Sequence, residues 1–186
     1  MLLKVENLTY EADKRTILNN INLNIEKGDT IAVIGPSGSG KSTLFKQLNN
    51  LISPTEGELY LDGKNYNDYS PEELRSRVSY LMQQSGLIGS TIEHNMKFPC
   101  EARGDKFDRE KAKQLIKQVG LGDYDLDAEI EHMSGGERQR ITIARQLMYE
   151  PEVLLLDEST SALETKNKEN IENIIFNLAK KGVALL

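Results

Sequence analysis

Gly35 to Ser42 reads Gly-Pro-Ser-Gly-Ser-Gly-Lys-Ser, and this stretch decides the fold. Glycines at this spacing allow backbone N–H groups to wrap phosphate oxygens without side-chain clashes. The apolar run Thr30–Ile34 before the loop predicts a buried strand, and the apolar spacing of Leu44 and Leu48 after it predicts a helix. A glycine loop between a strand and a helix indicates a phosphate-binding loop, because the positive end of the helix adds to the amide groups.

The loop residues have predicted roles at a bound nucleotide, with ATP and Mg²⁺ as the expected cofactors. Lys41 is expected to reach the β- and γ-phosphates, and the Ser42 hydroxyl is expected to ligate Mg²⁺. The loop alone does not separate transport ATPases from GTPases or small-molecule kinases, although the Asn-Lys-x-Asp motif of GTPases does not occur in the sequence. The predicted nucleotide contacts are Gly35, Pro36, Ser37, Gly38, Ser39, Gly40, Lys41, Ser42 and Thr43.

Composition and charge narrow the class of protein. The 186 residues include 23 basic and 29 acidic side chains, and the formal net charge of −6 argues against a surface built to hold nucleic acid. The longest uninterrupted apolar runs have four residues, whereas a membrane-spanning helix needs about 20. The single cysteine, Cys100, fits a reducing compartment and a structural role. We therefore expect a cytoplasmic chain that reaches a membrane only through a partner.

Strand and helix patterns alternate along the chain. Ser70-Pro71 followed by Glu73 predicts a helix start, and Pro151 predicts the end of another helix. Alternation of this kind is typical of an α/β layered fold with a largely parallel central sheet. Further strands are predicted at 3–7, 21–25, 58–61, 78–82, 153–157 and 183–186, and further helices from 90, at 108–119, from 134 and at 166–181.

Two adjacent carboxylates, Asp157 and Glu158, follow the apolar run Val153–Leu156. We expect this strand to lie beside the loop strand and to end at the ligand-binding edge of the sheet. Asp157 is then predicted to hold Mg²⁺ through water, and Glu158 to orient and deprotonate the attacking water. The alternative is an acidic pair that merely ends a strand.

A helix start of a particular kind is predicted at Ser134-Gly135-Gly136-Glu137. Ser134 and Glu137 fit a capping box, in which each residue satisfies a backbone N–H group of the other. The two glycines leave further N–H groups bare at the positive end of the helix, which favours an anion over packing.

The order of these motifs resembles the nucleotide-binding domain of ABC transporters over essentially the whole chain. The glycine loop is followed by Ser134–Arg140, Leu154–Glu158 and Ser159–Glu164. The resemblance implies the P-loop NTPase fold, with a RecA-like core around a mainly parallel sheet, an N-terminal antiparallel β subdomain and an inserted helical subdomain. It further implies one domain over 1–186, with the core at about 1–83 and 138–186 and the helical signature subdomain at about 84–137.

The resemblance also implies a site shared between two copies. Two such domains pair head to tail in this family, so Ser134, Gly135 and Gly136 of one copy are expected to bind the ATP held by the loop of the other. Gln83 is expected to contact Mg²⁺ and to sense the partner, and the glutamine after it is a weaker candidate. Tyr10 is expected to stack on adenine, while a tyrosine that only packs in a sheet is the alternative.

The sequence departs from the family pattern at a few positions. Met133 replaces the usual leucine, which is a mild change of shape, and Glu164 replaces the usual aspartate, which leaves its role open. In this family a histidine that contacts the γ-phosphate follows the strand to which Leu186 would belong. His94 and His132 both precede the Ser-Gly-Gly element, so neither takes that role. We therefore expect the 186-residue form to lack an edge of its sheet and to hydrolyse ATP slowly.

The implied partners are a separate membrane permease and a second ATP-binding subunit, which places the chain on the inner face of the cell membrane. Residues 86–95, Gly-Leu-Ile-Gly-Ser-Thr-Ile-Glu-His-Asn, are expected to face the permease. Leu87 and Ile88 would line a groove for a short permease helix. The alternative is that both side chains pack inside the helical subdomain.

The direction and cargo of transport are suggested by resemblance alone. Gly89–Ile92 with Asn95 is more similar to exporter ATPases than to importer ATPases. Leu51–Thr55, Val78–Tyr80 and Pro151–Leu163 resemble iron-export ATP-binding subunits of bacteria, so iron or another metal ion is a candidate cargo. A soluble ABC ATPase without a transport role and a non-hydrolysing regulatory module are the alternatives.

Overall fold

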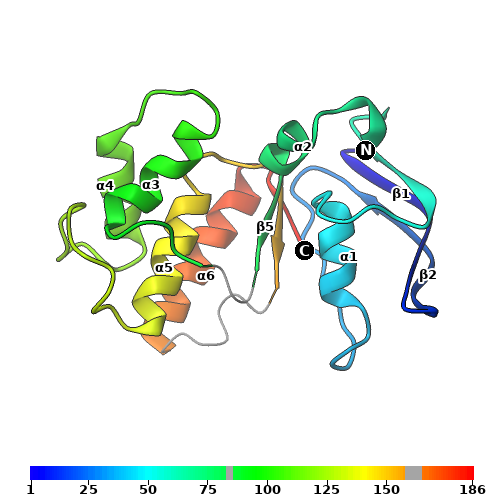
Figure 1. Ribbon diagram of the computed structural model, residues 1–186, viewed down its shortest axis with the longest axis horizontal. Coiled ribbons are helices and arrows are strands. Elements are labelled where there is room, and N and C mark those ends of the chain that lie inside the picture. Colours follow the sequence, from blue (N-terminus) through cyan, green and yellow to red (C-terminus); the bar gives the residue numbers. More distant parts are fainter. Residues whose placement is uncertain (83–85, 158–164) are drawn as a thin grey trace. The chain divides into compact units, whose positions relative to one another are not determined.

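The computed structural model of this chain describes residues 1–82, 86–157 and 165–186 (Figure 1). These residues form a mixed α/β structure with an antiparallel N-terminal sheet and a second sheet that includes parallel strands, so the predicted fold class is confirmed. The described residues divide into two compact units. Unit 1 is Met1–Tyr80, Pro151–Asp157 and Leu178–Leu186, and unit 2 is Leu81–Glu150 and Glu158–Asn177 as far as these are described.

An antiparallel sheet in unit 1 is built from the first strands of the chain. β1 pairs with β2 on one side and with β3 on the other. Leu3 and Val5 alternate inward, and a register shift before Leu8 keeps that side chain buried as well. The strands are β1 (Leu3–Ala12), β2 (Arg15–Ile25), β3 (Glu56–Leu61) and β4 (Lys64–Asn65), in the spatial order β2-β1-β3-β4.

A second sheet contains the strands that end at the candidate site. β6 and β7 are parallel. β5 and β6 also run in one direction, because Glu152 N donates to Arg77 O (2.9 Å) where both strands start and Tyr80 contacts Asp157 where both end. Figure 1 shows β5 and β6 as neighbours, and the spatial order is β5 (Val78–Leu81), β6 (Val153–Leu156) and β7 (Ala184–Leu185).

The segment before the glycine loop joins this sheet only at its start. Thr30 forms a parallel bridge with Leu185, and Ile31 N donates to Leu185 O at 2.9 Å. Since β7 is two residues long, the chain after Ile31 has no strand partner among the described residues, and Ile34 is 91% exposed. The predicted strand over 30–34 is therefore wrong beyond its first residues. The expected adjacency to the carboxylate strand is also wrong, because β7 lies between this segment and β6.

Helices α1 (Lys41–Leu48) and α2 (Pro71–Arg77), with a short 3₁₀ helix at Tyr66–Asp68, complete the named elements that lie wholly in unit 1. α1 buries Leu44, Phe45, Gln47 and Leu48, and α2 begins as predicted, because the Ser70 hydroxyl accepts from Glu73 N at 3.2 Å. Their apolar faces pack into the same core as the inward residues of both sheets.

Unit 2 is helical, and Figure 1 shows α3, α4 and α5 grouped together. α3 is capped by Thr91, one residue later than predicted, with the Thr91 hydroxyl accepting from His94 N at 3.2 Å. The buried Arg140 of α5 donates to Val119 O (3.2 Å) and Gly120 O (2.9 Å), so it fixes the end of α4. None of the described helices combines the length and apolar character that crossing a membrane requires. The helices are α3 (Ile92–Glu101), α4 (Arg109–Gln118), α5 (Gly135–Gln146) and α6 (Thr165–Lys180), the last of which ends in unit 1.

The unit 1 core is predicted to depend on Leu61. This side chain is fully buried, so Leu61→Ala should lower the free energy of unfolding by about 2–5 kcal/mol through lost burial and a residual cavity. Leu51→Ala is the matched control, because Leu51 is 45% exposed, and its effect should stay below about 1 kcal/mol. Urea unfolding followed by circular dichroism measures both, and equal losses would contradict this description of the core.

Candidate nucleotide-binding site

The glycine loop presents the amide groups of a helix start. Gly40 caps α1 with a φ of 94°, and a Cβ there would lie 3.1 Å from the Ile17 carbonyl oxygen, so glycine is required. Within the described part of the chain, the N–H groups of Gly40, Lys41 and Ser42 have no hydrogen-bond acceptor. Unpaired amides at the positive end of a helix bind anions. The predicted phosphate loop therefore has the local geometry that a phosphate needs.

The Lys41 side chain folds back over this loop. Its Nζ donates to Gly35 O at 2.7 Å and to Pro36 O at 3.1 Å. Hydrogen bonds from an ammonium group to a phosphate are stronger than those to neutral carbonyls. A phosphate at the loop would therefore compete successfully for Lys41. The loop residues from Pro36 to Ser39 are exposed, so a ligand can reach them.

Tyr10 lies close to the loop through the pairing of β1 with β2. Its register partner is Leu18, and Leu18 Cδ2 lies 3.1 Å from the position of a Cβ at Gly40. Tyr10 is half-buried and packs at the margin of the unit 1 core. This placement allows a tyrosine face to meet a base that extends from the loop, although the side chain also has a packing role.

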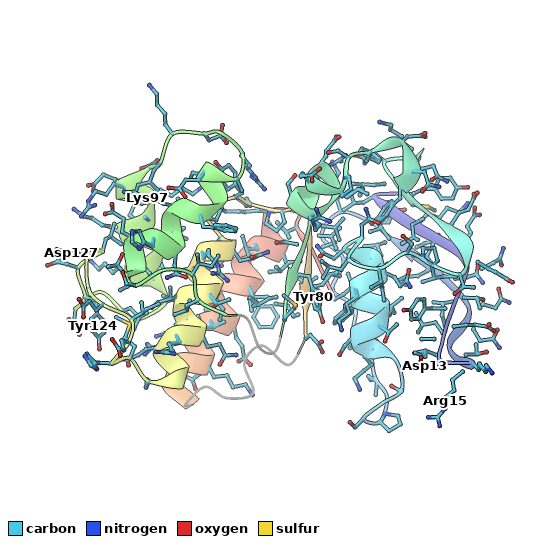
Figure 2. The ribbon with its side chains drawn as sticks, in the orientation of Figure 1. Asp13, Arg15, Tyr80, Lys97, Tyr124 and Asp127 are labelled. Carbon is cyan, nitrogen blue, oxygen red and sulfur yellow. The ribbon has the colours of Figure 1, made fainter. Side chains whose placement is uncertain are left out.

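Asp157, at the end of β6, is bonded to a tyrosine of the neighbouring strand. The Tyr80 hydroxyl donates to Asp157 Oδ2 at 2.7 Å. Burial raises the pKa of Tyr80, and the bond to Asp157 raises this pKa further, so the hydroxyl stays protonated and donates. The predicted Mg²⁺ ligand Asp157 is thus held by the hydroxyl of Tyr80, and Figure 2 labels this tyrosine beside β5.

The oxygen donors Ser42 and Asp157 suit Mg²⁺ chemically. Mg²⁺ keeps several waters and is commonly bound by one or two carboxylates together with substrate phosphates. Among the described residues, no group of three or more His, Cys, Asp or Glu side chains could hold a metal ion. The residues present therefore fit an open site that nucleotide phosphates and water complete.

The Ser-Gly-Gly element of unit 2 forms the predicted capping box. Glu137 N donates to Ser134 Oγ (3.3 Å) and Ser134 N donates to Glu137 Oε2 (2.8 Å). The sequence did not point to Tyr124, whose hydroxyl donates to Glu137 Oε1 at 2.8 Å. Among the described residues, the N–H groups of Gly135 and Gly136 have no acceptor, so this helix start is also open to an anion.

Several predicted site residues lie outside the described residues. They are Gln83, Glu158 and the stretch Ser159–Glu164. Their roles stay predictions. Tyr80, in contrast, has no role predicted from the sequence, and the structure brings its hydroxyl to Asp157. The available signal was an aromatic hydroxyl near the end of a strand that could neighbour the carboxylate strand.

The segment predicted to face a permease is fixed by a buried amide. Asn95 is fully buried, and its Nδ2 donates to Ile88 O (2.9 Å) and Thr91 O (2.8 Å), while its Oδ1 accepts from Ile88 N (2.8 Å). Arg145 adds two bonds of 3.2 Å to Gly86 O. These bonds tie the backbone of the segment to α3 and α5.

A hollow of about 430 Å³ lies beside this segment. Leu87, Ser90, Ile130 and Arg138 are among the residues that line it. Ile88 is 38% exposed and Leu87 is half-buried, so neither side chain is enclosed within unit 2. The segment therefore offers apolar surface next to a depression.

Residues 18–161 match the family model described as ABC transporter. The chain belongs to the ABC transporter family. The match contains the phosphate loop, the Ser-Gly-Gly helix start and Asp157, which are the features described above. Within this family the chain is an ATP-binding subunit and belongs to the transporter ATPases.

Several ABC transporter proteins are similar to this chain, and their names give different cargoes. The probable iron export ATP-binding protein FetA of Escherichia coli (strain K12) is 41% identical over 186 residues, which is all of this chain and 83% of its own length. The methionine import ATP-binding protein MetN of Staphylococcus haemolyticus (strain JCSC1435) is 42% identical over 92% of this chain and 52% of its own length. Among solved structures, a bacterial Atm1-family ABC exporter with ATP bound has a TM-score of 0.89 and 28% identity, over 98% of this chain and 34% of that chain.

The capping box predicts a pH-dependent contribution to stability. Hydrogen bonds from Ser134 and Tyr124 lower the pKa of Glu137 below its ordinary value of 4.5 in the folded chain. The stabilising effect of these hydrogen bonds is therefore complete at pH values above the ordinary pKa, and it is lost as the pH falls through the lowered pKa. The difference in unfolding free energy between the wild type and Glu137→Gln should shrink between about pH 6 and about pH 3.

Urea unfolding at each pH measures this difference. Glu101→Gln, at an exposed position on α3, is the control variant for the general effect of removing one carboxylate. A difference for Glu137→Gln that does not change with pH would contradict the role given to this carboxylate.

Proposed function

We propose that this ATP-binding subunit binds and hydrolyses Mg-ATP in a head-to-tail homodimer and drives a separate membrane permease. The single observation that carries the proposal is the loop before α1. Its amides at Gly40, Lys41 and Ser42 have no acceptor among the described residues, and the Lys41 ammonium group lies over the same loop. A cluster of donors without acceptors among the described residues, next to an ammonium group on a long side chain, is suited to a polyphosphate.

Each part of the site has a separate task in this proposal. Lys41 exchanges its carbonyl partners for β- and γ-phosphate oxygens, and Tyr10 stacks on the adenine. Bound Mg²⁺, held from Ser42, Gln83 and Asp157, would offset negative charge on the phosphates.

Glu158 carries the proton transfer of hydrolysis. It accepts a proton from water as the water oxygen bonds to the γ-phosphorus and the bond to the bridging oxygen breaks. The transferred γ-phosphate leaves as inorganic phosphate, and ADP remains with the loop.

The dimer follows from the second open helix start. Ser134, Gly135 and Gly136 offer amide and hydroxyl donors on unit 2, and in the proposal they contact the γ-phosphate bound to the loop of the other copy. ATP then joins the two copies. In each copy the proposed core covers about 1–83 and 138–186, and the proposed signature subdomain covers about 84–137. Hydrolysis removes the bridging γ-phosphate and thereby loosens the dimer.

The permease is proposed to bind at residues 86–95. Asn95 holds this backbone in shape, and Leu87 and Ile88 present apolar surface beside the hollow. A short apolar helix of the permease fits such a surface. In this proposal the contact places the chain on the cytoplasmic face of a membrane.

Export is the proposed direction, and iron or another metal ion is the proposed cargo. Two observations support it: the 41% identity to a probable iron export ATP-binding protein, and the likeness to a solved ABC exporter. In this proposal the permease, and not this chain, contains the residues that recognise the cargo.

Lys41→Ala tests nucleotide binding at the loop. Loss of a charged hydrogen-bond donor to phosphate should cost about 1.5–3 kcal/mol, which is about a 10- to 100-fold rise in the Kd for the fluorescent analogue TNP-ATP. Lys46→Ala is the matched control, because Lys46 is an exposed lysine in the last turn of the same helix, and its Kd should equal that of the wild type. Equal Kd values for all three proteins would place the nucleotide elsewhere.

Changing both Leu87 and Ile88 to Asp tests the permease surface. The variant should lose co-purification with a permease of the same organism co-expressed with it, because the change removes apolar contact and adds charge, while its Kd for TNP-ATP should stay at the wild-type value. Leu51→Asp, at an exposed leucine of unit 1, should leave co-purification intact. Unchanged assembly of the double variant would reject the segment as the docking surface.

A further inference from the structure

We propose that Tyr80 is a positioning residue of the Mg²⁺ site, whose hydroxyl orients Asp157 and thereby sets how strongly Mg²⁺ tightens nucleotide binding. The inference rests on the proposed function, since it requires that the chain uses Mg-ATP. It adds a residue of β5 to the site formed by the glycine loop and Asp157.

The hydrogen bond between Tyr80 and Asp157 has a defined direction. A hydroxyl has one proton, and Tyr80 gives it to Asp157 Oδ2 at 2.7 Å. This bond orients one carboxylate oxygen of Asp157 and leaves the other available to a cation and its waters. The tyrosine thus presents Asp157 as an oxygen acceptor, which is what Mg²⁺ requires.

The Tyr80 ring is held by packing that does not depend on its hydroxyl. Its side chain is buried, with 7% of the residue exposed, and it makes an edge-to-face contact with Phe45 at a centroid distance of 6.0 Å and an angle of 72°. Phe45 lies one turn after Ser42 on α1, so the contact fixes the ring against the same helix that carries the loop. A phenylalanine would keep this packing. The hydroxyl is therefore separable from the core, and its buried position is compensated by the bond to Asp157.

Tyr80→Phe is the direct test. The Kd for TNP-ATP is measured for the purified chain with excess Mg²⁺ and with EDTA, and the ratio of the two values reports the coupling between metal and nucleotide. Removal of a group that supports metal ligands commonly reduces metal affinity by about 10- to 100-fold. In Tyr80→Phe the ratio should fall toward one, by about 10-fold where the wild-type ratio allows it, while the Kd in EDTA should stay unchanged.

Tyr66→Phe is the matched control. Tyr66 is also a buried tyrosine of unit 1, and its hydroxyl donates to Leu48 O (2.8 Å) at the far end of α1. Loss of this bond should affect stability and leave the ratio unchanged. A double variant with Asp157→Asn adds a second control, because Tyr80→Phe should have no further effect on the ratio when the carboxylate it orients is gone.

The possible results separate the two proposals. A wild-type chain whose TNP-ATP affinity does not respond to Mg²⁺ would overturn the metal assignment itself, and this inference with it. A wild-type response that Tyr80→Phe leaves intact would overturn this inference alone. If Tyr80→Phe does not fold, Phe45→Leu takes its place, because it loosens the ring and keeps the hydroxyl. Its ratio should lie between one and the wild-type value, and a wild-type ratio would again overturn the role of Tyr80.

Discussion

The first turn of a helix cannot satisfy its own amide groups, and at α1 this requirement governs the surrounding structure. The N–H groups of Gly40, Lys41 and Ser42 have no acceptor among the described residues. β2 approaches Gly40 so closely, with the Ile17 carbonyl 3.1 Å from a Cβ position, that the loop has room for glycine only. Leu44, Phe45 and Leu48 then anchor the helix in the core. Within the described part of the chain, the amides of the first turn stay without acceptors because the buried side chains hold the rest of α1 in the core.

The parallel strands bring the chemistry to the same edge of unit 1. Arg77, which makes ion pairs with Glu152 and Asp62, joins the starts of β5 and β6 and so fixes their register. With that register, Tyr80 at the end of β5 meets Asp157 at the end of β6. β7 is hydrogen-bonded to β6 on one side and to the segment that leads to the loop on the other. Tyr80 and Asp157 are thus brought together by the register of two strands.

The motifs were predictable from sequence because their physical causes are local. A glycine loop, a capping box and an acidic pair after an apolar run each depend on neighbours within a few residues, and the capping bonds of Ser70 and Ser134 were foreseen for that reason. The strand over 30–34 was not foreseen correctly, because strand formation needs a partner and β7 pairs only with its start. Tyr80 was missed because its partner Asp157 is distant in sequence and meets it only through the order of the strands.

The family gives this chain an ATP-binding role, and the geometry of the loop indicates where the phosphates would lie. The most direct measurement is amide hydrogen exchange by mass spectrometry with and without Mg-ATP. If the bare amides bind phosphate, exchange of the peptide spanning residues 35–43 should slow markedly when ATP binds, because those N–H groups then gain acceptors. Saturating ATP binding with unchanged exchange in that peptide would contradict the account.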